Sequence, residues 1–123
     1  MEPSKELLDG FATAQRLLRA NRPVEYEITP AYLKIHLAGS AGWSVCRLLD
    51  FGGPHPSVLV PLPAEMVTNL VPLLEATPMG PRWSKIALMT SHDMRVIGPA
   101  LCAAWDACSD AASAGEQQEE PLG

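Results

Sequence analysis

Twelve prolines in 123 residues constrain the fold of this chain more than any other feature of its sequence. Proline fixes φ and lacks a backbone N–H, so it interrupts helix interiors and the centres of sheets. We therefore expect several short elements joined by fixed corners, and not a bundle of long helices. The length and the hydrophobic fraction of 47% suffice for one domain with one core.

The periodicity of the apolar residues assigns the elements between these corners. Helical spacing predicts a helix over residues 4–21, capped by Ser4, and a second helix from Pro63 that Pro72 should kink or break. Alternation predicts strands over residues 24–28, 32–38 and 43–51, the last with a break near Leu48-Leu49, and the β-branched run SVLV indicates a strand over 57–60.

Residues 82–98 allow two interpretations. We expect strands over 82–90 and 94–98 that form a hairpin around a turn at 91–93, but residues 91–98, SHDMRVIG, could instead open a helix. A last helix starts at Gly98-Pro99. The order α-β-β-β-(β)-α-β-β-α predicts an α+β two-layer sandwich over residues 1–113, a mostly antiparallel sheet packed by about three helices.

Residues 114–123 are expected to form a disordered acidic tail outside this domain. They include Glu116, Glu119 and Glu120 and no basic residue. Removing these three charges from the net charge of −5 leaves −2 for the body of the protein. A nearly neutral body argues against nucleic acid as a partner, because such binding needs a basic face.

The stretch FGGPHPSVLVPLP, residues 51–63, could be a phosphate-binding loop or a corner between strands. A phosphate loop needs converging backbone N–H groups at a helix N-terminus, and Pro54 and Pro56 remove two of these donors. A strand-like run follows the glycines instead of a helix. The pattern favours a structural corner, in which His55 is a solvated loop residue.

No residue is assigned to a catalytic or metal site, and no cofactor is expected. Ser91, His92 and Asp93 have the residue types of a catalytic triad, but adjacent side chains in a tight turn diverge. The candidate metal ligands lack chelating spacing; they are His36, His55, His92, Cys46, Cys102 and Cys108.

The three cysteines are an odd number and are expected to be reduced, which fits a cytoplasmic protein. The sequence MEPSKELLDG lacks the apolar region of a signal peptide. No apolar run approaches the roughly 20 residues of a membrane span, so no membrane partner is expected.

Two groups of residues are candidates for binding a partner protein. Arg16, Arg19 and Arg22 recur at helical spacing and either form a basic patch or complement the dipole of the first helix. Trp43 and Trp83 follow loops, where tryptophan serves either as an interface anchor or as a core residue at a strand end.

No diagnostic motif identifies a family. The element order is similar to that of bacterial type III secretion chaperones, and this resemblance implies a small acidic protein that forms a homodimer. We expect a non-enzymatic protein-binding module acting as adaptor, chaperone or inhibitor, a class that includes bacterial accessory proteins and phage inhibitors of host systems. One alternative is a small enzyme whose site assembles from distant residues such as His36, His92 and Asp93. Another is a structural subunit of a larger assembly.

Overall fold

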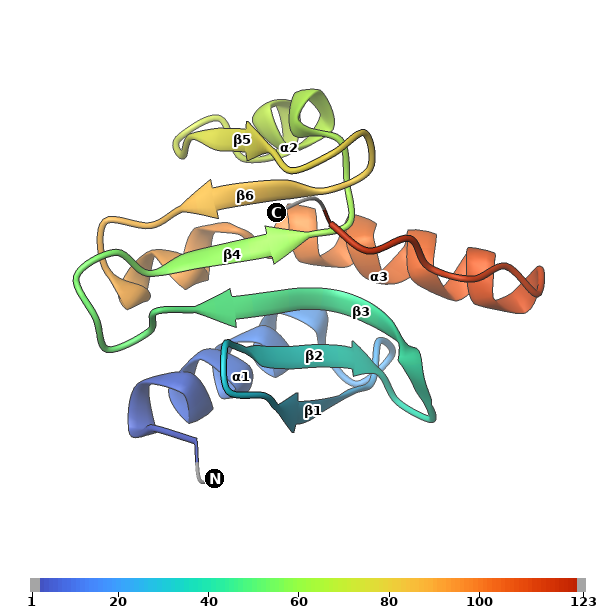
Figure 1. Ribbon diagram of the computed structural model, residues 1–123, viewed down its shortest axis with the longest axis horizontal. Helices are drawn as coiled ribbons and strands as arrows, with labels where there is room; N and C mark the ends of the chain where they lie inside the picture. Colours follow the sequence, from blue (N-terminus) through green and yellow to red (C-terminus); the bar gives the residue numbers. More distant parts are fainter. Residues whose placement is uncertain (1–2, 122–123) are drawn as a thin grey trace.

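Six strands form one antiparallel sheet in this computed structural model, which describes residues 3–121 (Figure 1). The order across the sheet is β1-β2-β3-β4-β6-β5. The strands are β1 (Val24–Ile28), β2 (Leu33–Leu37), β3 (Ser40–Leu49), β4 (Ser57–Val60), β5 (Ala76–Pro78) and β6 (Ser84–Ala87). The predicted α+β class is confirmed, and the sheet remains open at β1 and β5.

Helices form the second layer behind this sheet (Figure 1). They are α1 (Lys5–Leu18), α2 (Ala64–Leu70), the 3-10 helix η1 (Ser91–Val96) and α3 (Gly98–Ser113). Helix α3 crosses behind β3 and contacts α1, while α2 lies beside β5 and β6. Within residues 3–121, no helix has the length and apolar character needed to cross a membrane.

The first helix begins where its sequence predicts. The Ser4 hydroxyl accepts a hydrogen bond from the backbone N–H of Leu7 at 3.2 Å and so caps the helix. Gly10, Ala14 and Leu18 recur every four residues and are the buried positions of α1. A Cβ on Gly10 would lie 2.8 Å from a Leu48 methyl carbon, so glycine is what lets α1 approach the sheet this closely.

The core lies between the sheet and the helices. The strand side chains that are buried there include Leu33, Ile35, Leu48, Val58 and Ile86. Leu101 of α3 packs against them from the helix layer. Tyr26 on the edge strand β1 is 41% exposed but stacks edge-on against Phe11 of α1, with ring centroids 4.8 Å apart. His36, expected to face outward into solvent, is only 7% exposed and lies where the register between β2 and β3 shifts.

The predicted hairpin over residues 82–98 is wrong, and the alternative, a helix that opens at Ser91, is observed. Strand β6 pairs with β5, and residues 91–96 form η1. The reason is a capping box: the Asp93 carboxylate accepts from the N–H groups of Met89 and Thr90, and the Thr90 hydroxyl accepts from His92. Pro78 is compatible with β5 because this strand lies at the edge of the sheet.

The double glycine forms a corner between β3 and β4. Gly52 has φ +92°, and the Gly53 N–H donates to the Asp50 carbonyl at 2.9 Å. The Asp50 carboxylate accepts from the backbone N–H of His55 at 2.9 Å and closes the turn. The side chain of His55 is exposed and makes none of these bonds.

We predict that Gly53→Ala destabilises the fold by about 1 kcal/mol or more, because the Asp50 side chain that closes the turn leaves no room for the new methyl group. Its Cβ would lie 2.1 Å from an Asp50 carboxylate oxygen, so the turn would have to rearrange. His55→Ala should be nearly neutral. Urea unfolding of both variants checks this, and a stable Gly53→Ala beside a destabilised His55→Ala would contradict the corner assignment.

Candidate functional site

The chain after α3 turns back and lies against the sheet, where the sequence predicted a disordered tail. Gly115 adopts φ +77° and reverses the chain, and residues 116–121 then run beside β3 toward β6 (Figure 1, red). We call residues 114–121 the tail. Composition alone suggested solvation, but the tail is held by polar contacts with the sheet that composition does not reveal.

The first contact replaces a missing strand. Strand β4 pairs with β3 only from Arg47 to Leu49, so Ser44 lies beyond the end of that ladder. The Gln118 side chain fills the gap. Its Oε1 accepts from the Ser44 N–H and its Nε2 donates to the Ser44 carbonyl, both at 2.8 Å. One amide side chain thus satisfies both backbone groups of Ser44, as a neighbouring strand would.

The next two tail residues contact a tryptophan and an arginine. The Trp83 indole N–H donates to the backbone carbonyl of Glu119 at 2.7 Å. The Glu120 carboxylate forms an ion pair with Arg47, whose side chain is only 8% exposed. The Arg47 guanidinium lies over the rings of Tyr32 and Trp83, 4.8 and 5.0 Å from their centroids. Arg47 is therefore held in an aromatic slot, with the tail carboxylate at its open end.

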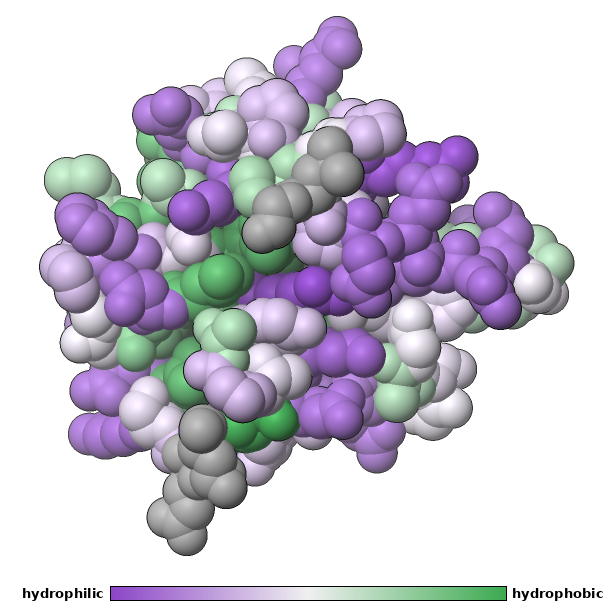
Figure 2. Space-filling model, in the orientation of Figure 1, coloured by the Kyte–Doolittle hydropathy of each residue, from purple (hydrophilic) through white to green (hydrophobic). Residues whose placement is uncertain are grey.

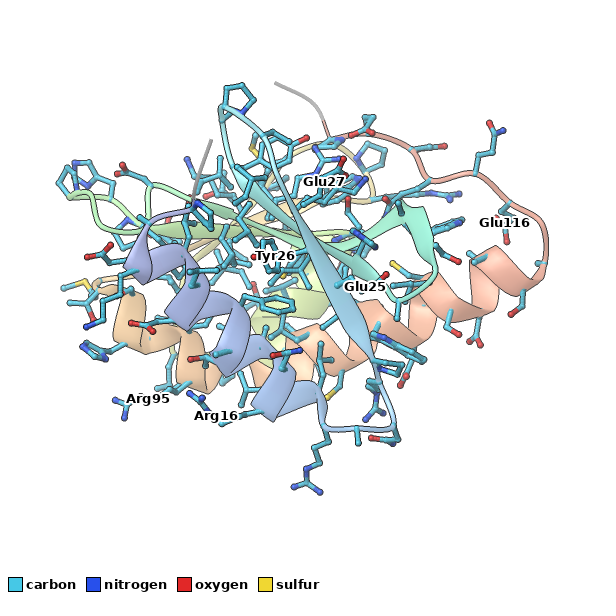
Figure 3. The ribbon with its side chains drawn as sticks, turned by 90° about the horizontal axis from the view of Figure 1, so that it is seen from below. Arg16, Glu25, Tyr26, Glu27, Arg95 and Glu116 are labelled. Carbon is cyan, nitrogen blue, oxygen red and sulfur yellow. The ribbon has the colours of Figure 1, made fainter. Side chains whose placement is uncertain are left out.

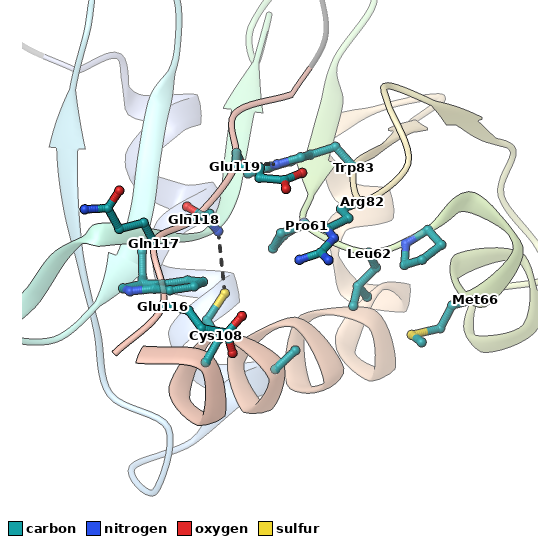
Figure 4. A pocket seen from close by; sticks show the side chains of 14 residues that line it. Pro61, Leu62, Met66, Arg82, Trp83, Cys108, Glu116, Gln117, Gln118 and Glu119 are labelled. Carbon is teal, nitrogen blue, oxygen red and sulfur yellow. Dashed lines mark hydrogen bonds between the residues drawn. The ribbon is translucent and has the colours of Figure 1, made fainter. Parts of the chain in front are cut away.

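Beneath the tail lies a cavity of about 320 Å³ between α2, α3 and the sheet. Figure 4 shows Leu62 and Met66 on one side, Cys108 at the base and the tail across from them, with Arg82 reaching in near Leu62. Its apolar lining includes Trp43 and Trp83. We call this cavity, together with the contacts of Ser44, Arg47 and Trp83, the tail cleft.

The surface around the tail cleft has mixed character. Figure 2, in the orientation of Figure 1, shows apolar surface over the middle of this sheet face and hydrophilic side chains along the path of the tail. Met66, at the rim, is 44% exposed. A partner protein could therefore reach an apolar wall and a charged margin at one place, which is the usual anatomy of an interface.

The structure brings together two of the five residues predicted to bind a partner. Trp43 and Trp83, far apart in the sequence, both line the tail cleft. Trp43 is half-buried and Trp83 is 2% exposed.

The arginines of the first helix lie elsewhere. Arg16 is on the helix side of the molecule, near Arg95 and distant from Glu116 of the tail (Figure 3). Arg16 donates to the Thr13 hydroxyl, and Arg19 forms the C-cap of α1 with φ 65°.

Arg22 has a structural contact. Two of its guanidinium nitrogens donate to the two carboxylate oxygens of Asp106, at 3.0 and 3.1 Å, and join the end of α1 to α3. These hydrogen bonds from Arg22 hold the pKa of Asp106 below its usual value. Arg16 and Arg22 thus each have a local side-chain contact.

Asp93 and His36, two of the residues considered for catalysis, have other partners. Asp93 caps η1, and His36 places its Nδ1 2.8 Å from the Leu37 carbonyl oxygen. Over residues 3–121, no three His, Cys, Asp or Glu side chains gather in a geometry for a metal ion. Burial raises the pKa of Cys46 above its usual range and that of Cys108 to about 12, so both are thiols at neutral pH.

Sequence reasoning missed the residues that hold the tail. Arg47 offered a signal, since a charged side chain within the apolar strand WSVCRLLDF needs a partner when that strand is buried. Gln118 and Glu120 offered none, because the run EQQEEP has the composition of a solvated segment.

No family model, curated protein or solved structure matches this chain. The similarity in element order to type III secretion chaperones therefore has no match in sequence or structure behind it.

Proposed function

We propose that this protein is a small non-enzymatic protein-binding module, acting as adaptor, chaperone or inhibitor, and that its partner docks in the tail cleft. The observation that carries the proposal is that Trp43 and Trp83 line one cavity, while Arg47 stacks on the ring of Trp83 beside it. Tryptophan and arginine are the residues that most often dominate the binding energy of protein interfaces.

The contacts in the cleft favour a polypeptide as the bound partner. The tail is engaged through the backbone of Ser44 and through its own backbone carbonyl at Glu119, which receives the Trp83 indole N–H. Recognition of an extended chain at the free part of a strand is a common way to bind peptides. Met66 and Leu62 add apolar surface beside that chain.

Met66→Glu should abolish partner binding with little effect on folding, because Met66 lines the cavity but is 44% exposed. The matched control is Met89→Glu, at a methionine that is 84% exposed between β6 and η1 and away from the cleft. Tagged full chains carrying each substitution are compared with wild type by quantitative mass spectrometry of the proteins they retain from cells that naturally make this protein. Circular dichroism confirms each fold.

We expect wild type and Met89→Glu to retain the same stoichiometric protein, and Met66→Glu to lose it about tenfold or more, as for a buried charge at an interface. Equal retention by all three would show that the partner does not dock in the tail cleft. If no chain retains a stoichiometric protein, the binding-module proposal fails.

A further inference from the structure

The tail does not satisfy every polar group in the cleft. Arg47 and Ser44 are 6% and 1% exposed, and the Arg47 Nε and the Ser44 Oγ have no hydrogen-bond partner within residues 3–121. Buried polar atoms are normally paired, and leaving them unpaired is unfavourable. The tail therefore leaves two buried polar atoms of the cleft unpaired, and a segment that also paired these atoms would bind the cleft more favourably.

The unpaired Arg47 Nε, together with the groups that the tail already pairs, describes the chemistry of a better occupant. The Arg47 guanidinium has donors in a fixed fork, and a carboxylate can accept two of them, whereas the Glu120 contact uses Nη2. Arg82, which also lines the cavity, adds a second positive charge. The Ser44 N–H and carbonyl require a donor and an acceptor together, as an amide side chain or a neighbouring backbone supplies.

We propose that the tail cleft receives an extended acidic segment of the partner protein, and that tail residues 118–120 compete with that segment for the same contacts. This inference rests on the proposed function and names the partner's chemistry. The partner segment places a carboxylate against Arg47, a backbone carbonyl against the Trp83 indole, and an amide or backbone group against Ser44.

Tethering makes the tail an effective competitor despite its few contacts. A segment joined to the body by one short turn is present at a local concentration in the millimolar range. A free partner competes with the tethered tail. Its apparent affinity is therefore its intrinsic affinity multiplied by the fraction of molecules in which the cleft is open. The Glu120 side chain is 75% exposed, so an incoming carboxylate can reach Arg47 while the tail is leaving.

The test uses the full chain with two substitutions, Gln118→Ala and Glu120→Ala, that remove side-chain contacts of the tail. We call this double substitution the released variant. The matched control carries Gln117→Ala and Glu119→Ala, which make the same chemical change one position earlier. Gln117 is exposed, and Glu119 binds Trp83 through its backbone carbonyl, so this control tail keeps its contacts. The probe is a fluorescent peptide with the sequence of residues 114–121, measured by anisotropy.

We expect the released variant to bind the peptide about tenfold or more tightly than the wild type and the control, since it has lost the charge-assisted contact of its own tail. Adding Arg47→Met to the released variant should remove binding, and so should glutamine at the three glutamate positions of the peptide. If the released variant unfolds, Glu120→Ala is compared with Glu119→Ala instead.

Equal peptide affinity in the released variant and the control would overturn the inference, as would equal binding of the glutamine peptide. Either result leaves the proposed function standing if Met66→Glu still loses the partner. The peptide titration therefore tests competition by the tail, and the retention experiment with Met66→Glu separately tests the proposed function.

Discussion

Trp83→Ala is expected to lower the free energy of unfolding by about 3–5 kcal/mol, the range for removing a buried aromatic side chain. The Trp83 side chain is 2% exposed, its ring lies under the Arg47 guanidinium, and its indole N–H donates to the Glu119 carbonyl. Truncation would empty the space beneath Arg47 and would also remove the hydrogen bond that holds the Glu119 carbonyl of the tail. Urea unfolding of the full chain, followed by circular dichroism, measures the loss.

Trp105→Ala provides the control for this prediction. Trp105 also donates its indole N–H to a backbone carbonyl, that of Pro23 at 3.1 Å, but it is only half-buried on α3. We expect a smaller loss of stability than at Trp83. Equal losses below about 1 kcal/mol at both positions, a range typical of surface substitutions, would show that Trp83 is not part of the packed interior.

The large effect at Trp83 also decides which residues can test binding. The sequence offered Trp83 either as an interface anchor or as a core residue, and its burial favours the core. A binding defect in Trp83→Ala would therefore combine loss of fold with loss of contact. Trp43 and Met66, which are less buried, separate these two effects better.

The fold was predictable where local patterns and burial agree. Alternation located β1 and a β-branched run located β4 at their observed bounds, and Ser4 marked the start of α1. Pro72 ended α2, as its missing N–H requires. In α1 and β1 one face meets the core and the other meets solvent, so the sequence period reports the structure directly.

Prediction failed where a local hydrogen bond or a long-range pairing decides the structure. The segment from Ser91 to Val96 alternates like a strand, but the capping box at Thr90 and Asp93 closes it into a 3-10 helix. The three residues of β5 are too few for a periodic signal, and they become a strand only because β6 lies beside them.

The candidate site was predictable only in part, because its two halves come from distant segments. Both tryptophans were identified, but nothing in the sequence places them at one cavity. The tail was assigned to solvent because its charged and polar residues cannot form a core. What holds it is specific pairing with Ser44, Trp83 and Arg47, and such pairing depends on a β3 edge that exists only once the sheet is formed.

The alkylation rate of Cys108 reports directly whether the tail covers the cleft. Cys108 is 2% exposed, and the Gln118 side-chain nitrogen lies 3.7 Å from its sulfur. Cys46, fully buried on the core side of the sheet, is an internal reference for unfolding of the whole domain. Mass spectrometry follows both thiols in the same molecule during reaction with iodoacetamide at neutral pH.

We predict that Gln118→Ala with Glu120→Ala speeds alkylation of Cys108 by about tenfold to a hundredfold, because the lost charge-assisted bond is worth about 1.5–3 kcal/mol of local closing. Release also hydrates Cys108, which lowers its raised pKa and increases the reactive thiolate. Cys46 should stay slow, and Gln117→Ala with Glu119→Ala should react like wild type. An unchanged Cys108 rate in the released variant, or equal acceleration of Cys46, would contradict the account of a tail that covers the docking cleft.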